Sequence, residues 1–337
     1  MRDPEPPTGP RQPLDEAGRK AEAANRGVVV SAGGEAGLVA GLPPRAATVP
    51  APEVGPVGDR TRGLRRRIAY VLMVAYALLM FVPFSWTIVT SFKTRPDSLN
   101  LSLIPDPVSF EGWRFTLENL EPSIFTLFTN SVIIAFVVTL TNLVLGSLGG
   151  YAFARLRFPG RELLFLVVLA TLMIPDQLRL VPVFVLFTEI GLTRGVGQYV
   201  AVITILAISA TSIFLLRQYF LSIPKDLEEA ARIDGAGFFT TFWRVMLPLA
   251  TPALAAVTIL QFQGTWNGFF WPVILLRDQA HATLPQALYL FRESGGFSTN
   301  WPPLMAVICI ATLPILLLYI FFQRYFVEGI AASGVKG

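Results

Sequence analysis

The sequence is short of charged residues, cysteine and histidine. Asp, Glu, Lys and Arg make up 15% of the 337 residues, against roughly 25% in soluble globular domains. Cysteine and histidine occur once each, as Cys309 and His281. A single cysteine cannot form an intrachain disulfide, and a single histidine cannot build a histidine metal cluster. We therefore expect no resident metal and no cofactor bound by this chain.

Apolar sequence takes the place of the missing charge. Hydrophobic residues account for 53% of the chain, and the mean hydropathy is +0.56. The charges gather in residues 1–67 and in short segments between long uncharged runs. The net charge of +4 forms no basic face interleaved with aromatics on a soluble domain, so nucleic acid is not an expected partner. The composition indicates an integral membrane protein surrounded by lipid.

Five uncharged runs are each long enough for one membrane crossing, which takes about 20 helical residues. They cover 68–92, 122–154, 195–216, 245–276 and 294–323. A sixth stretch, 163–188, is interrupted by Asp176 and Arg179, and we count it as a crossing that Pro175 kinks near its outer end. The predicted fold is all-α, with six transmembrane helices at approximately 68–91, 129–153, 163–186, 197–217, 249–275 and 303–323.

Residues 1–64 precede the first crossing and differ in composition from the rest. They are rich in Pro, Ala, Gly and charge, and contain few large apolar side chains. Such a segment cannot bury enough apolar surface to offset the entropy lost on ordering. We expect a disordered cytoplasmic tail over 1–64 and a transmembrane domain over 65–337.

Arginine and lysine near the helix ends predict the orientation, because inner loops carry an excess of them. They place both termini and the loops after the second and fourth crossings on the cytoplasmic side. The residues concerned are Arg62, Arg65, Arg66, Arg67, Arg155, Arg157, Arg161, Arg217, Lys225, Arg232, Arg244, Arg324 and Lys336. The spanning runs hold no mid-membrane acid or base of the kind that ion-coupled carriers often use. The energy for transport is therefore expected to come from elsewhere.

The longest predicted inner segment, 222–248, has the features of two short helices joined by a turn. Ser222 and Pro224 are typical of a helix start, and Gly235 is typical of a left-handed helix stop. Ala230 and Ala231 leave one stretch of the first helix without bulk. We interpret the pair as a cytoplasmic hairpin that docks into the cleft of a partner protein.

The spacing in this hairpin resembles the coupling-loop motif of ABC importer permeases. Glu229-Ala230-Ala231 is followed after three residues by Gly235, and after nine more by Val245-Met246-Leu247-Pro248. The family pattern has Ile where this chain has Val245. The flanking residues are similar to those of the carbohydrate-uptake, maltose-type family, and in particular to its smaller permease subunit. The resemblance covers approximately residues 65–337.

The resemblance implies a type I ABC importer permease core in the cytoplasmic (inner) membrane of a prokaryote, which moves a sugar. Its implied partners are two ATPase subunits, a second and typically different permease subunit, and an extracytoplasmic solute-binding protein. ATP is used by the ATPases. This chain has no Gly-x4-Gly-Lys-Ser/Thr phosphate loop of its own and is expected not to be an enzyme. The implied coupling residues are Glu229, Ala230, Ala231, Asp234, Gly235, Leu247 and Pro248.

Four polar or aromatic residues are candidates for a sugar path. Sugars are held by hydrogen-bonding side chains and aromatic faces, and the residues are Asn130, Gln263, Trp266 and Asn267. The alternative is that Asn and Gln join helices and that Trp packs at the membrane interface. The family often has Glu after the Trp-Asn pair, where this chain has Gly268.

Other functions stay open at this point. A permease of the same family could carry a related solute such as glycerol phosphate. A secondary carrier or channel would work without an ATPase and respond to ion gradients. A membrane enzyme would need a catalytic constellation at the interface, which one His and one Cys do not supply.

Overall fold

The computed structural model describes residues 59–294 and 300–334. The chain divides into two units, residues 1–68 and 69–337, and in the first of them only the beginning of helix α2 is described. Residues 1–58 of the tail predicted over 1–64 therefore lie outside the described residues. The last residues of that tail are helical, because α2 begins at Asp59 rather than at the predicted Ile68.

Every regular element in the described ranges is helical. In chain order they are α2 (Asp59–Ser91), η1 (Asp97–Leu99), α3 (Glu111–Arg114), η2 (Phe115–Asn119), α4 (Ile124–Arg155), α5 (Arg161–Ala170), η3 (Thr171–Met173), α6 (Asp176–Glu189), α7 (Gly197–Leu206), α8 (Ala210–Ser222), α9 (Asp226–Ile233), α10 (Phe238–Thr241), η4 (Phe242–Met246), α11 (Leu247–Leu249), α12 (Thr251–Trp266), α13 (Phe270–Leu275), η5 (Gln279–His281), α14 (Leu284–Ser294) and α15 (Trp301–Gly334). Here η2 and η4 are π-helical turns, and the other η elements are 3₁₀ turns.

Three helices of the described chain are long and apolar enough to cross a membrane unbroken, within α2, α4 and α15. Three bent pairs meet the same test together: α5–η3 with α6, α7 with α8, and α10–α11 with α12. With each bent pair taken as one crossing, the described residues contain the six crossings that the sequence predicts.

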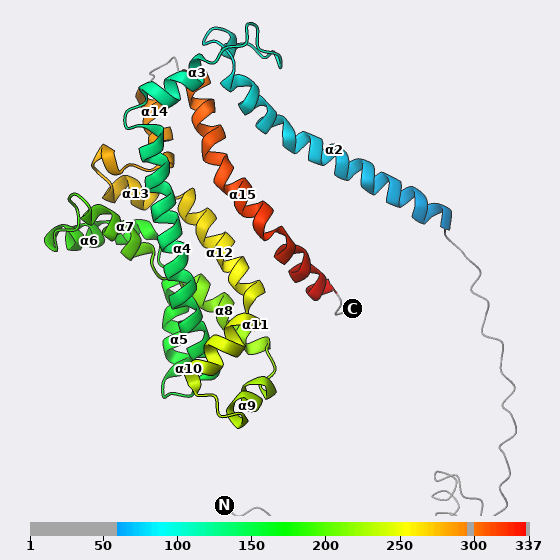
Figure 1. The fold of residues 1–337 in the computed structure, drawn as a ribbon, viewed down its shortest axis with the longest axis vertical. Coiled ribbons are helices and arrows are strands. Elements are labelled where there is room, and N and C mark those ends of the chain that lie inside the picture. Colours follow the sequence, from blue (N-terminus) through cyan, green and yellow to red (C-terminus); the bar gives the residue numbers. More distant parts are fainter. Residues whose placement is uncertain (1–58, 295–299, 335–337) are drawn as a thin grey trace, which may run out of the picture. The chain divides into compact units, whose positions relative to one another are not determined.

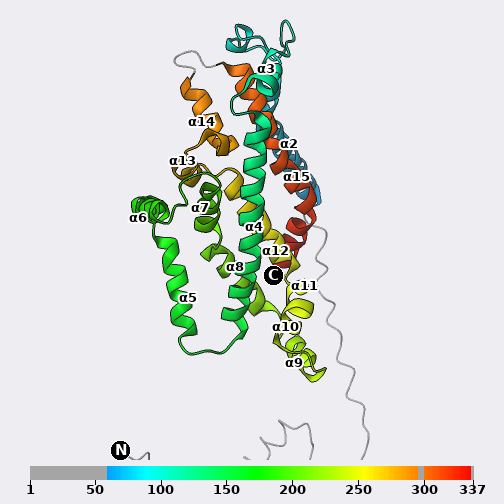
Figure 2. The same cartoon turned by 60° about the vertical axis from the view of Figure 1, so that its left-hand side comes forward.

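The third crossing differs from the single kinked helix predicted over 163–186. Helices α5 and α6 meet at 99°, so α6 turns away from the direction of α5 (Figure 2). Pro175 lies immediately before α6, and Ile174 has the extended conformation (φ −90°, ψ 110°) that a following proline favours. The fourth and fifth predicted helices are broken as well, after Leu206 and after Trp266.

Helix α4 runs along the centre of the bundle, with α8 and α12 packed against it (Figure 1). Gly146 and Gly150 permit the close approach to α8: a Cβ on Gly150 would lie 2.8 Å from Leu216 Cβ and 2.9 Å from the backbone nitrogen of Arg217. Glycine at these positions therefore serves close helix packing. One turn before Gly146 on α4, buried Asn142 donates from Nδ2 to the carbonyl of Leu206 at 2.8 Å. It thereby satisfies a backbone group at the end of α7, where the helix breaks.

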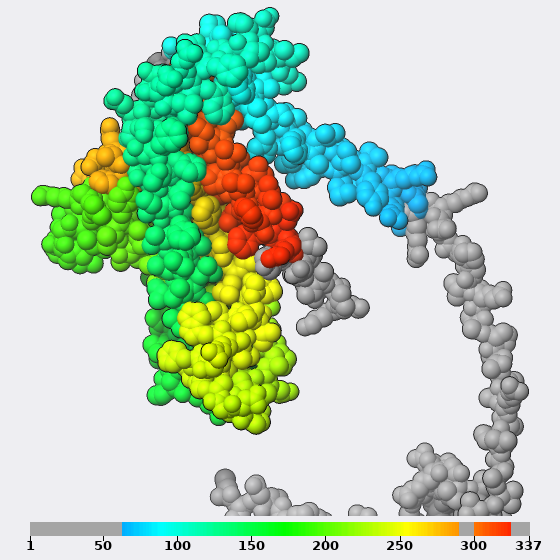
Figure 3. Space-filling model, in the orientation of Figure 1, coloured from blue at the N-terminus to red at the C-terminus, as the bar shows by residue number. Residues whose placement is uncertain are grey.

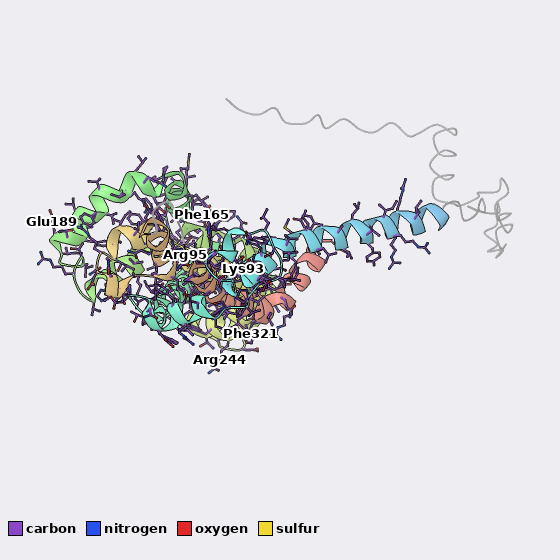
Figure 4. The ribbon with its side chains drawn as sticks, turned by 90° about the horizontal axis from the view of Figure 1, so that it is seen from above. Lys93, Arg95, Phe165, Glu189, Arg244 and Phe321 are labelled. Atoms are coloured by element: carbon purple, nitrogen blue, oxygen red, sulfur yellow. The ribbon has the colours of Figure 1, made fainter. Side chains whose placement is uncertain are left out.

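The loops before α3 form one end of the bundle, opposite the end that holds α9 (Figure 1). Fully buried Lys93 organises them, because its Nζ donates to the carbonyls of Asn100 (2.9 Å) and Ser102 (2.7 Å). Seen along the bundle, Lys93 lies among these elements, whereas Glu189 at the end of α6 lies at the periphery (Figure 4). The lysine charge is thus matched by carbonyl dipoles in a loop that closes over the helix ends.

Candidate coupling hairpin and substrate cleft

The hairpin predicted over 222–248 is present as two helical segments, α9 and the run from α10 to α11. Gly235 joins them with φ +84°, a left-handed conformation that glycine adopts without steric cost. Its backbone nitrogen donates to Arg232 O at 3.0 Å, and that of Ala236 donates to Ala231 O at 2.9 Å. The predicted glycine stop is confirmed, while α9 begins at Asp226, slightly later than Ser222 and Pro224 suggest.

The seven predicted coupling residues divide between the surface and the interior of the hairpin. Ala231 is buried and Leu247 is partly buried; the exposed ones are Glu229, Ala230, Asp234, Gly235 and Pro248. Of the two alanines that leave one stretch of α9 without bulk, Ala230 faces outward and Ala231 faces the rest of the protein.

The free surface of the hairpin is apolar as well as charged. Ile233 is 85% exposed and Phe239 is 69% exposed, and Leu227 and Trp243 are also exposed. The hairpin, coloured yellow-green to yellow, lies at the lower end of the coloured helical bundle in the space-filling view (Figure 3). Large apolar side chains gathered on a surface that also carries charge are typical of protein–protein contact sites.

A buried ion pair joins the hairpin to the bundle. Arg155 is the last residue of α4, and its Nε lies 2.9 Å from Glu228 Oε1 on α9, with side chains 4% and 8% exposed. Nη2 of Arg155 also donates to the carbonyl of Phe220 at 2.7 Å and to that of Ile223, where α8 ends. One guanidinium thus holds together the ends of α4 and α8 and the first turn of α9.

Aromatic packing continues the same junction. The ring of Tyr151, one turn before Arg155, lies 5.0 Å from that of Phe242, 5.4 Å from that of Phe238 and 5.6 Å from that of Phe220 (centroid distances). The rings of Tyr151, Phe220 and Phe242 belong to a buried cluster that includes Met246 and Ala250, whereas Phe238 is exposed. The second half of the hairpin is therefore fixed to α4 and α8 by side chains that pack as a protein core.

Two of the four predicted substrate-path residues make internal hydrogen bonds. Buried Asn130 donates from Nδ2 to the carbonyls of Ala280 (3.0 Å) and Ala282 (2.8 Å), and its Oδ1 accepts from the Tyr199 hydroxyl at 2.7 Å. Buried Trp266 donates from Nε1 to Ala311 O at 3.0 Å. For Asn130 this is the joining role that the sequence offered as the alternative, whereas Trp266 joins α12 to α15, where the sequence offered packing at the membrane interface.

Gln263 and Asn267 are exposed on this chain, and neither is among the residues that line the cleft beside α12. The cleft is lined instead by the opposite side of α12. Residues 261, 264, 265 and 268, at helical spacing, line a cleft with a volume of about 580 Å³. The other walls come from residues 171–176 and 205–210, where the α5–α6 and α7–α8 crossings break, and from residues 269–272 at the start of α13, just after α12 ends.

Sequence reasoning missed this cleft and the Arg155–Glu228 pair. The helical spacing of Gln261, Gly264, Thr265 and Gly268 is a signal that could have indicated a polar, small-residue face. For the ion pair, no local signal connects two residues so far apart in the chain. Among the described residues, no group of three or more His, Cys, Asp or Glu side chains could hold a metal ion, and the absence of a resident metal stays a prediction.

The family model described as "Binding-protein-dependent transport system inner membrane component" matches residues 142–331, a range that contains the hairpin and the cleft. The chain belongs to this family. It is a membrane-spanning permease component of a transport system, as the hairpin motif indicated.

Relatives agree with this membership. The chain is 37% identical over 276 residues to the arabinooligosaccharides transport system permease protein AraQ of Halalkalibacterium halodurans, covering 80% of this chain and 97% of that protein. It is 35% identical over 258 residues to the diacetylchitobiose uptake system permease protein NgcG of Streptomyces coelicolor, covering 76% and 84% respectively.

A solved structure of similar fold is described as a bacterial ABC transporter involved in the import of the acidic polysaccharide alginate. The likeness has a TM-score of 0.68 at 26% identity and covers 81% of this chain and all of that one. The predicted fold class, an all-α type I ABC importer permease core, is confirmed.

Proposed function

We propose that this chain is the permease subunit of an ATP-driven importer that carries an oligosaccharide or another small sugar into the cell. The observation that carries the proposal is the hairpin: a family-typical motif displayed at one end of the bundle and fixed to α4 and α8 through Arg155. Relatives named for arabinooligosaccharide and diacetylchitobiose uptake support a sugar as the substrate.

The hairpin is suited to transmit motion from an ATPase. Its exposed face offers Leu227, Ile233 and Phe239 for apolar contact, beside the charged Glu229. Its inner face is bound to the bundle by an ion pair and by the aromatic cluster of Tyr151. A partner that moves the hairpin therefore moves the inner ends of α4 and α8 with it, because packed interiors shift as units.

The assembly would contain two ATPase subunits, a second permease subunit and an extracytoplasmic solute-binding protein. The family description itself specifies dependence on a binding protein. The exposed apolar side chains of α2 from residue 69 onward would face lipid or the second permease. Arginines of both predicted inner loops meet at one end of the bundle, where Arg217 pairs with Glu162 at 3.1 Å, which supports a cytoplasmic location for the hairpin.

Reconstitution of the complete transporter in liposomes tests the proposal. Arabinotriose, diacetylchitobiose and glycerol 3-phosphate serve as transport probes, because some relatives are named for glycerol 3-phosphate transport. We expect uptake of one of the two sugars that needs ATP and is stimulated by its loaded binding protein.

Glu229→Lys reverses a charge on the exposed face of α9 without disturbing a buried contact. We expect it to uncouple ATP hydrolysis from the loaded binding protein and to reduce uptake by roughly tenfold or more, the factor that follows from losing about 1.4 kcal/mol of contact energy. Glu118→Lys, at the opposite end of the bundle, is the matched charge reversal and should leave both rates unchanged. Coupled uptake at the wild-type rate by Glu229→Lys would contradict the assigned role of the hairpin. Preferential uptake of glycerol 3-phosphate would make that solute, rather than a sugar, the transported substrate.

A further inference from the structure

The cleft at the three helix breaks has the dimensions and chemistry of a small-molecule site. Its volume of about 580 Å³ lies within the roughly 300–1,000 Å³ typical of such sites. It lies where three segments are interrupted: between α5 and α6, between α7 and α8, and between α12 and α13. Interrupted helices place backbone polar groups at membrane depth, which proteins tolerate where those groups line a cavity or meet a ligand.

The walls of the cleft hold hydrogen-bonding groups without protein partners. Trp271 is 3% exposed, and within the described part of the chain its Nε1 has no hydrogen-bond partner. The same is true of buried Nε of Arg179, although another nitrogen of that guanidinium pairs with Asp176. A buried donor without an acceptor costs about 1–3 kcal/mol, so both groups favour a bound oxygen atom.

Further polar groups lie around these two donors. Gln261 is oriented by donating from Nε2 to Ser212 Oγ at 3.0 Å, and its amide oxygen is an acceptor for a hydroxyl group. Helices α6 and α8 both begin at the cleft, and Ser209 precedes α8 without capping it through its side chain. The first N–H groups of a helix have no partner within it, so they add donors to the site.

Aromatic side chains complete the lining. Phe269, Phe270 and Trp271 are among the residues that line the cleft. Sugar rings carry hydroxyl oxygens around their edge and apolar C–H groups on their faces. Donors, an amide oxygen and aromatic faces therefore match one sugar ring better than they match an ion or a lipid chain.

We infer that this cleft binds a sugar ring of the transported substrate, with Trp271 and Arg179 donating to its oxygens and Gln261 accepting from a hydroxyl. The inference rests on the proposed function and places this chain's part of the substrate path on the side of α12 that carries Gln261, Gly264 and Thr265. It differs from the path predicted through Asn130, Gln263, Trp266 and Asn267, two members of which are engaged in packing.

Gly264 allows the cleft to be filled without disturbing the fold. A Cβ at this position meets no heavy atom within 4 Å, and the residue lines the cleft. In the complete reconstituted transporter we expect Gly264→Leu to reduce uptake of the carried sugar, arabinotriose or diacetylchitobiose, to the level of empty liposomes. Stimulation of ATP hydrolysis by the loaded binding protein should persist. Gly63→Leu, which adds the same side chain at a position of α2 where a Cβ also meets no heavy atom within 4 Å, should transport as wild type.

A binding measurement separates occupancy from transport. Thr265→Cys in a Cys309→Ser background places one thiol in the cleft, and the carried sugar should slow its reaction with a small thiol reagent, while sucrose at equal osmolarity should not. Labelling that the carried sugar leaves unchanged, or wild-type uptake by Gly264→Leu, would overturn the inference. So would loss of the second permease subunit from the Gly264→Leu complex, since a partner side chain would then occupy the cleft. If the wild-type complex moves neither sugar, the proposed function fails, and the inference with it.

Discussion

Arg155→Met is expected to abolish coupled transport and to destabilise the inner end of the bundle. The substitution keeps an unbranched side chain but removes the guanidinium, so it leaves the Glu228 carboxylate buried without its partner and frees the carbonyls of Phe220 and Ile223. Removing one member of a buried ion pair typically costs about 3–5 kcal/mol. Uptake by the reconstituted transporter and the melting temperature of the purified complex should both fall.

Glu228→Gln is expected to have the smaller effect of the two. Arg155 retains its two carbonyl acceptors in this variant, and the neutral amide is cheaper to bury than a lone carboxylate. The double variant, Arg155→Met with Glu228→Gln, should lose less stability than the two single variants lose in sum, since each single change already breaks the ion pair. Glu162→Gln is the matched control, because the Glu162 side chain is 63% exposed in its pairs with Arg161 and Arg217 and exposed pairs contribute little. A stable, coupled Arg155→Met complex would contradict the role given to this junction.

Gly150→Ala is expected to separate α4 from α8 although it adds a single methyl group. The new Cβ would lie 2.8 Å from Leu216 Cβ and 2.9 Å from the Arg217 backbone nitrogen, and a backbone atom cannot move aside as the end of a flexible side chain can. Overpacking of this kind costs typically about 1–3 kcal/mol. The melting temperature of the complex should fall, and coupled uptake should fall with it, because α8 leads into the hairpin.

The neighbouring glycine supplies the control for this prediction. A Cβ on Gly149 would meet Ile213 at 3.4 Å or more, an ordinary van der Waals distance. Gly149→Ala should therefore melt at or slightly above the wild-type temperature, since alanine is favoured over glycine inside a helix by about 0.5–1 kcal/mol. If both variants melt alike, the helix contact at Gly150 is looser than the structure shows.

The sequence was sufficient for the features that depend on local patterns. Uncharged runs identified the crossings, and the spacing from Glu229 to Pro248 identified the hairpin and its family. Gly235 was assigned correctly because a left-handed turn requires a residue without a side chain.

The features that the sequence did not reveal depend on packing between distant segments. The α7–α8 break is stabilised by Asn142 of α4, which satisfies the freed carbonyl of Leu206, and nothing near Leu206 predicts that donor. Pro175 indicated a bend, but the 99° angle depends on how α6 meets its neighbours. Asn130 and Trp266 were plausible sugar contacts by residue type, and only the structure shows that their polar atoms are already engaged.

Cross-linking of the hairpin to the ATPase tests the central claim most directly. Ala230 is exposed on α9, and Ala230→Cys in a Cys309→Ser background offers one thiol to a short bifunctional reagent. Val196→Cys, exposed between α6 and α7 on the predicted outer side, is the control. The proposed function predicts that Ala230→Cys cross-links to the ATPase subunit in the assembled transporter and that Val196→Cys does not. An assembled, transporting complex in which Ala230→Cys fails to reach the ATPase, or reacts with a membrane-impermeant reagent from outside, would contradict it.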